Sequence, residues 1–89
     1  MSLSIKQTRS FDRDLDRMEN RGEELPRLFH VIEILTSGKR LEARYKDHKL
    51  TGNWVGRREC HVKPDWLLIY RIEKNTLILE RTGSHSDLF

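Results

Sequence analysis

Four side chains able to exchange protons lie in the second half of the chain, where strands and loops are expected to begin or end: His48, His61, Asp65 and His85. Histidine titrates close to neutral pH, so it can act as an acid or as a base. RNA cleavage without a metal needs both, because the ribose 2′-hydroxyl loses a proton while the 5′-oxygen of the leaving group gains one. Arg81 could bind the phosphate through both arms of its guanidinium group and offset the growing charge.

Two aromatic residues near this set, Trp66 and Phe89, offer flat faces on which a nucleobase could stack. Most of these residues also have a structural interpretation. A histidine at the end of a strand can be a solvated side chain, Asp65 can be a turn residue after Pro64, and Trp66 can belong to the core. The interpretation as a site therefore depends on whether the fold brings the residues together.

Metal binding is the competing chemical interpretation, since Cys60 and His61 are adjacent and His48 and His85 could complete a site. Neighbouring residues on a strand point to opposite faces, so Cys60 and His61 cannot readily bind one ion. The paired ligand spacing of structural zinc sites is also missing. We therefore expect no metal and no other cofactor.

The chain has 89 residues, which is the size of one domain, so residues 1–89 are expected to form a single unit. Its 17 Lys and Arg residues against 14 Asp and Glu give a net charge of +3, which favours contact with polyanions such as RNA. Cys60 is the only cysteine, which excludes an intramolecular disulfide. No signal peptide and no apolar run near the roughly 18 residues of a membrane span are present, so we expect a cytoplasmic protein.

The N-terminal half predicts a strand followed by a helical hairpin. Residues 2–8 alternate polar and apolar side chains, which is typical of a strand with one buried face. Ser10 is the expected N-cap of a first helix that ends at Gly22, with an apolar face formed by Phe11, Leu15 and Met18. Pro26 suits the first turn of a second helix that ends at Gly38, with an apolar stripe formed by Leu28, Phe29, Ile32 and Leu35.

The C-terminal half predicts a meander of strands. Residues 41–52 show no clean period and should form a loop with a brief extended piece. Three strands follow at residues 54–61, 66–72 and 76–82, and residues 83–89 form a tail. Helices grouped before strands favour an α+β fold in which the helical hairpin covers one face of a mainly antiparallel four-stranded sheet. The opposite face must then be solvated or functional.

This strand order brings part of the chemical set together. His61 and Asp65 flank the turn between two antiparallel strands, and Arg81 returns to the same edge of the sheet if the last strand pairs with the one before it. His85 follows four residues later. These four residues are therefore predicted to share one pocket, whereas no path can be deduced for His48.

Three runs of sequence carry a resemblance to a known family: YKDHKLTGNWVG at residues 45–56, RECHVKPDWLLIY at 58–70 and RTGSHSDLF at 81–89. In this order and at these separations they closely resemble the YafQ branch of the RelE/ParE toxin superfamily. The match covers roughly the second half of the chain, and the first half agrees in its helical-hairpin character. The family pattern ends at Phe89, so we expect the chain to be complete there.

The resemblance implies a RelE-like, microbial-RNase-like fold and a cytoplasmic toxin of a type II toxin–antitoxin pair. The expected activity is metal-free cleavage of mRNA in the ribosomal A site. The expected partners are the ribosome, mRNA and an inhibitory antitoxin. The active-site residues that the resemblance implies are His48, His61, Asp65 and His85, with Arg81 near the scissile phosphate and Trp66 and Phe89 in supporting roles.

The division of labour among these groups is open to more than one assignment. We expect His48 or Asp65 to assist deprotonation of the 2′-hydroxyl, His85 to protonate the leaving oxygen, and His61 to orient either. Two other functions also stay open. A non-nuclease protein of the same fold, such as an inhibitor of DNA gyrase, would not need the histidines, and a small RNA-binding accessory protein would need only the basic surface.

Overall fold

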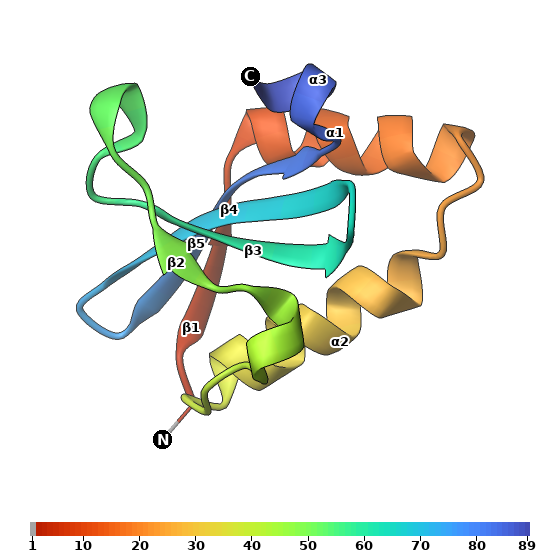
Figure 1. Cartoon of the computed structure of the whole chain (residues 1–89). Coiled ribbons are helices and arrows are strands. Elements are labelled where there is room, and N and C mark those ends of the chain that lie inside the picture. The colour runs from red at the N-terminus through yellow and green to blue at the C-terminus, as the bar shows by residue number, and fades with distance from the viewer. Residues whose placement is uncertain (1) are drawn as a thin grey trace.

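The fold is described from a computed structural model, which places residues 2–89; Met1 lies outside the described residues. The elements follow in the order β1 (Ser4–Gln7), α1 (Arg9–Asn20), α2 (Leu25–Thr36), β2 (His48–Lys49), β3 (Arg58–Lys63), β4 (Trp66–Glu73), β5 (Thr76–Gly83) and α3 (His85–Leu88) (Figure 1). Single 3₁₀ turns at Ala43–Tyr45 and Gly52–Trp54 flank β2. The prediction of an α+β fold is confirmed.

The strands form one five-stranded sheet in the order β1-β5-β4-β3-β2. β1 pairs with β5 in parallel, and the other three pairings are antiparallel. The expected four-stranded sheet therefore lacked β2, a strand of two residues that is too short to produce a sequence period. The strand predicted from Trp54 begins only at Arg58, because Gly56 adopts a φ of +88° that interrupts the extended run.

Helix α1 begins two residues earlier than predicted. Its N-cap is Thr8 rather than Ser10, and the Thr8 hydroxyl accepts a hydrogen bond of 3.0 Å from the backbone N–H of Phe11. Phe11 and Met18 are buried as expected, but the helix also buries the carboxylate of Asp14, which is only 1% exposed. An acid on the buried face needs a partner, and it finds one on β5.

Helix α2 carries Pro26 in its first turn, as predicted, and buries a stripe against the sheet that includes Leu28, Ile32 and Leu35. Phe29 was assigned to this stripe wrongly, since 49% of it is exposed. Val31 takes the place of Phe29 because it lies three residues after Leu28, whereas a neighbouring residue is turned by about 100° around the helix axis.

The two faces of the sheet differ in cover. Both helices join the same face in the main core, together with side chains of β3, β4 and β5 such as Cys60, Leu68 and Leu79. The opposite face, here called the open face, carries only a small cluster of Leu67, Ile69 and Leu88. β1 was expected to bury one face but stays exposed at the outer edge of the sheet. Within residues 2–89, no helix combines the length and apolar character needed to cross a membrane.

Candidate active site

The predicted gathering of His61, Asp65 and His85 is confirmed at one edge of the open face. His61 pairs with Leu67 across the β3–β4 hairpin, and Asp65 lies in the turn that joins the two strands. Leu67 in turn pairs with Gly83 at the end of β5, so the chain that follows brings His85 back to the hairpin. The imidazole rings of His61 and His85 lie 5.9 Å apart between centroids.

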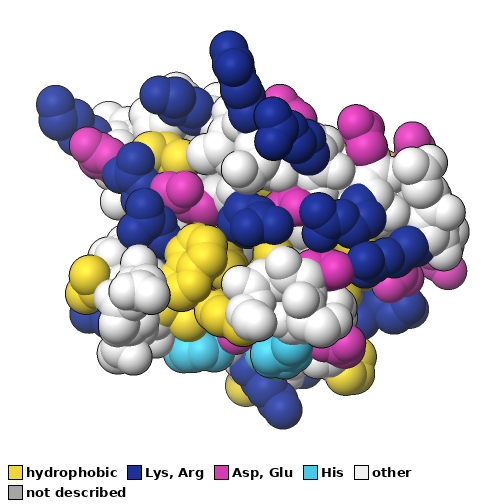
Figure 2. All heavy atoms as spheres, turned by 90° about the horizontal axis from the view of Figure 1, so that it is seen from above, with side chains coloured by type: hydrophobic (Ala, Val, Ile, Leu, Met, Phe, Trp, Pro, Cys, Tyr) yellow, Lys and Arg dark blue, Asp and Glu magenta, His cyan; other side chains and the backbone are white. Residues whose placement is uncertain are grey.

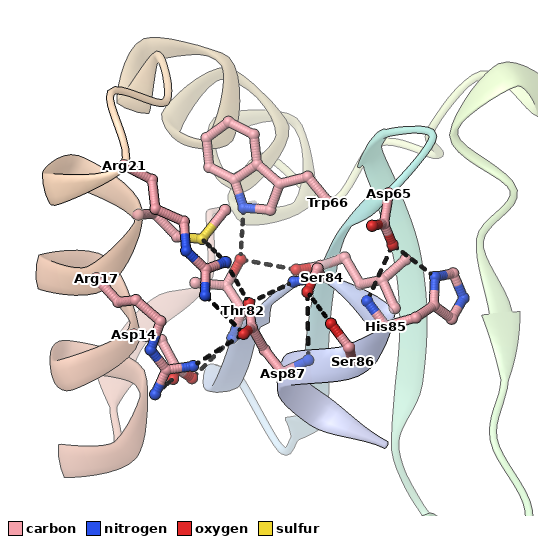
Figure 3. Close-up of polar contacts among 12 residues, drawn as sticks. Asp14, Arg17, Arg21, Asp65, Trp66, Thr82, Ser84, His85, Ser86 and Asp87 are labelled. Atoms are coloured by element: carbon pink, nitrogen blue, oxygen red, sulfur yellow. Dashed lines mark hydrogen bonds and ion pairs between the residues drawn. The ribbon is translucent and has the colours of Figure 1, made fainter.

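Asp65 binds His85 twice. Its Oδ1 accepts a hydrogen bond of 3.0 Å from the backbone N–H of His85, and it lies 2.9 Å from the ring Nδ1 (Figure 3). These two bonds, the backbone one foremost, hold the pKa of Asp65 below its usual range. A carboxylate on Nδ1 orients the ring and stabilises the imidazolium form, as in the aspartate–histidine pair of serine hydrolases. Nε2 of His85 is left without a partner among residues 2–89, and the side chain is 56% exposed.

His48 reaches the site through β2, which sequence reasoning could not place. It pairs with Glu59 of β3, and β2 forms the outer edge of the sheet beside β3. Its Nδ1 lies 2.8 Å from the carbonyl oxygen of Lys46, and a carbonyl can only accept, so Nδ1 carries the proton. Lys46 itself adopts a left-handed φ of 49°, which turns the chain so that its carbonyl meets the ring.

His61 is held in the same manner. Its Nδ1 lies 3.2 Å from the carbonyl oxygen of Pro64 and therefore carries the proton. The Nε2 atoms of His48 and His61 lie 3.5 and 3.6 Å from the same atom, Oε1 of Glu59. Glu59 is only 5% exposed, so its carboxyl group is shielded from water by the two rings and the sheet.

Glu59 is the residue that sequence reasoning missed. It precedes His61 by two positions on β3, so strand alternation alone places both side chains on the open face. A glutamate with such a spacing could have been singled out from the sequence. A carboxylate shared by two histidines stabilises whichever ring takes a proton, because opposite charges in a poorly solvated site attract strongly.

Arg81 does not point at the histidines. Its Nε and Nη2 bind the two carboxylate oxygens of Asp14 on α1 at 2.7 and 3.1 Å, and these bonds raise its pKa above the ordinary value. Asp14 also accepts the backbone N–H of Thr82 at 3.1 Å. The structure therefore gives Arg81 a structural partner, while a quarter of its side chain stays exposed.

The two aromatic residues have different places. Trp66 is fully buried in the main core, where its indole N–H donates to the Thr82 hydroxyl at 2.9 Å. Because Trp66 is buried, a nucleobase cannot stack on it, and the alternative interpretation as a core residue holds. Phe89 is 59% exposed, and its ring lies 6.3 Å from that of His85 and 6.0 Å from that of Trp54. Trp54, rather than Trp66, is the tryptophan that packs against Phe89 near His85.

No group of three or more His, Cys, Asp or Glu side chains within residues 2–89 is arranged to hold a metal ion. Cys60 lies in the main core, on the opposite face of β3 from His61, as strand alternation predicted. Burial raises the pKa of its thiol well above the usual range, which disfavours the thiolate that metals bind.

We expect Glu59→Gln to lower the predicted RNA-cleaving activity by about tenfold to a hundredfold while preserving the fold, because the amide cannot stabilise a protonated histidine. The matched control is Glu80→Gln, which removes a carboxylate from β5 that binds Arg71 instead of a histidine. Cleavage rates at several pH values, with circular dichroism as a check on folding, measure the effect. Equal activity in the two variants would remove Glu59 from the site.

The comparisons with known proteins agree on one family. The family model for the bacterial toxin of type II toxin–antitoxin system, YafQ, matches residues 3–89. The chain is 37% identical over 86 residues to the mRNA interferase toxin YafQ of Escherichia coli strain K12, and the match covers 96% of this chain and 94% of that protein.

Solved structures lead to the same family. The E. coli DinJ–YafQ toxin–antitoxin complex contains a chain that superposes with a TM-score of 0.92 at 36% identity, covering 100% of this chain and 99% of that one. A metal-bound toxin from Helicobacter pylori superposes with a TM-score of 0.91 at 46% identity, covering 98% and 99%. The family model and these likenesses extend over nearly the whole chain, including the first half, which the three sequence runs did not cover. The chain belongs to the YafQ family of toxins of bacterial type II toxin–antitoxin systems.

Proposed function

We propose that this toxin is an mRNA interferase, an endoribonuclease that cuts mRNA in the ribosomal A site by acid–base catalysis with attack of the ribose 2′-hydroxyl. The observation that carries the proposal is the pair of carboxylate-supported histidine groups on the open face, His85 with Asp65 and His48 with His61 around Glu59. The chemistry needs one proton acceptor and one donor, and these two groups supply them. The E. coli relative, whose name states mRNA interferase activity, supports that part of the proposal.

We assign the general acid to His85. Its Nε2 is uncommitted, and Asp65 stabilises the protonated ring, so it is equipped to protonate the 5′-oxygen. Because Asp65 is engaged by His85, we assign the base that accepts the 2′-hydroxyl proton to His48 or His61, with Glu59 balancing the charge that forms. Phe89 would hold a base of the mRNA against its exposed face, with Trp54 packed on its edge.

The surface around the histidines suits a polyanion. A cleft of about 470 Å³ is lined by His61 and, among other residues, by four basic side chains from α2, the first 3₁₀ turn, the position after it and β3: Arg27, Arg44, Lys46 and Lys63. Figure 2, seen from above relative to Figure 1, shows many Lys and Arg side chains interspersed with Asp and Glu, and histidines at one side of this face. Contacts to phosphates supply most of the affinity of proteins for RNA, so these cations favour a bound ribosome and mRNA.

We further propose that a cognate antitoxin binds and inhibits the toxin in the cytoplasm, where the ribosomes are. The support is the DinJ–YafQ complex, in which the toxin chain shares this fold over its whole length. A partner that covers charged and apolar surface would also stabilise a domain of this small size.

The test is cleavage of a defined mRNA, with and without programmed ribosomes and with and without a chelator, mapped by primer extension. We expect discrete cuts within the A-site codon that need ribosomes and persist in the chelator. Cleavage that the chelator abolishes would contradict the metal-free mechanism. DNA damage without RNA cuts would indicate a gyrase inhibitor instead, and RNA binding that survives loss of the histidines without any cutting would indicate an accessory protein.

A further inference from the structure

The catalytic turn α3 is tied to helix α1 by an ion pair that the chemistry described above does not use. Both arms of the Arg21 guanidinium donate to Asp87, from Nη1 to Oδ2 at 2.6 Å and from Nη2 to Oδ1 at 2.8 Å (Figure 3). Arg17 adds a weaker contact to Asp87 at 3.6 Å. We propose that Arg21 and Asp87 are positioning residues that hold His85 in its catalytic orientation; the inference rests on the proposed role of His85.

A helix as short as α3 is not stable on its own. It has four residues, far fewer than an isolated helix needs, so its geometry depends on contacts with the rest of the protein. Leu88 is buried beneath it and anchors one side. His85 contacts Asp65 on the hairpin, and Asp87 faces α1 on the other side (Figure 3). The turn is therefore held by the hairpin through His85 on one side and by α1 through Asp87 on the other.

Asp87 is built into the turn as well as into the ion pair. Its Oδ2 accepts the backbone N–H of Ser84 at 2.9 Å, and its own N–H donates to the Ser84 hydroxyl at 3.2 Å, which completes a capping box. The hydrogen bonds from Arg21 are the largest cause that holds the pKa of Asp87 far below its usual range. The carboxylate is only 11% exposed, so water screens its contact with the guanidinium little.

The approach of this carboxylate to the chain is close. Gly83 has a φ of +157°, and a Cβ at that position would lie 2.9 Å from Oδ2 of Asp87. The last residue of β5 therefore leaves space for the carboxylate directly before the turn begins. Strand β5, the turn α3 and helix α1 meet at Asp87. A displacement of Asp87 would therefore also displace His85, which precedes it by two residues.

The experiment compares Arg21→Gln and Asp87→Asn in the full-length toxin with programmed ribosomes. We expect kcat to fall by about tenfold in each, since a small displacement of a catalytic group is costly, while KM for the ribosome complex stays unchanged. The two variants change the net charge in opposite directions. A direct role in RNA binding would instead raise KM for Arg21→Gln and lower it for Asp87→Asn, and that result would overturn the proposal.

Asp87→Asn retains an oxygen for the Ser84 N–H, so it separates the ion pair from the helix cap. The double variant should lose no more activity than either single variant, because the two residues act through one contact. Hydrogen exchange of the His85 backbone N–H, which donates to Asp65, should quicken in both variants without a matching fall in the unfolding midpoint. Two results would show that the ion pair is merely structural: additive losses of activity in the double variant, or hydrogen exchange of the His85 N–H that changes only as much as the global stability does.

The control is Glu73→Gln, which breaks a more exposed arginine–carboxylate pair, with Arg71 near the far β4–β5 turn, and should retain full activity. Should Asp87→Asn fail to fold, Arg21→Gln carries the same test, since Arg21 is 45% exposed on the surface of α1.

A His85→Ala variant that cuts normally would refute the proposed function. An inactive His85→Ala variant beside a fully active Asp87→Asn variant would refute the positioning role alone.

Discussion

Replacement of His85 with alanine is expected to reduce mRNA cleavage by about a hundredfold to ten-thousandfold, the range that general acid catalysis contributes. The physical reason is that the leaving 5′-oxygen loses its proton donor, the ring that Asp65 orients. Primer extension on a translated mRNA with purified toxin and ribosomes measures the loss. Folding should be preserved, because the His85 side chain is more than half exposed.

The matched control for this variant is Ser86→Ala, an exposed neighbour on the same turn. Binding of the cognate antitoxin, measured by calorimetry, should survive in both variants, because the antitoxin needs the surface and not the proton transfer. Undiminished cutting by His85→Ala would show that the acid lies elsewhere. Loss of cutting together with loss of antitoxin binding would point to a folding defect rather than to catalysis.

The largest expected effect on stability comes from Asp14→Ala. This change leaves the Arg81 guanidinium without its partner and removes the acceptor of the buried Thr82 N–H. Breaking a buried pair costs about 3–5 kcal/mol, and the lower end applies here because Arg81 is one-quarter exposed. Against a total stability of roughly 5–15 kcal/mol for a domain, this loss is severe.

Urea unfolding followed by circular dichroism measures the effect of Asp14→Ala. Asp16→Ala is the matched control, because Asp16 lies on the same helix but is exposed to solvent. We expect a large shift of the unfolding midpoint for the first variant and almost none for the second. Equal midpoints for the two variants would mean that the contact between α1 and β5 does not stabilise the domain.

The part of the site that could be predicted is the part that neighbouring strands determine. A hairpin places its two ends together whatever its surroundings, so His61, Asp65 and the turn with His85 followed from strand order. Alternation along β3 separated Cys60 from His61 for the same reason. The main core followed from the helical period, except where Phe29 lies just beside the buried stripe.

The rest depends on pairings between distant segments, which leave no local period. His48 reaches the site through two residues of strand, too few to show alternation. The partner of Arg81 is an acid 67 positions earlier on α1, and that of Asp87 is an arginine 66 positions earlier. Trp54 and Trp66 could not be told apart as site or core residues, because both precede runs with strand-forming residues.

The parallel pairing of β1 with β5 joins residues about seventy positions apart, as Ser4 meets Thr76. Contacts of such long range require a large loop to close before they contribute, which slows folding and makes it cooperative. The segment from His48 to His85 holds all four proton-exchanging residues, but Arg81 and α3 are bound by Asp14 of α1 and by Arg21 at its C-terminal end. A fragment with only this segment would therefore lack the assembled pocket, and catalytic competence should appear together with global folding rather than before it.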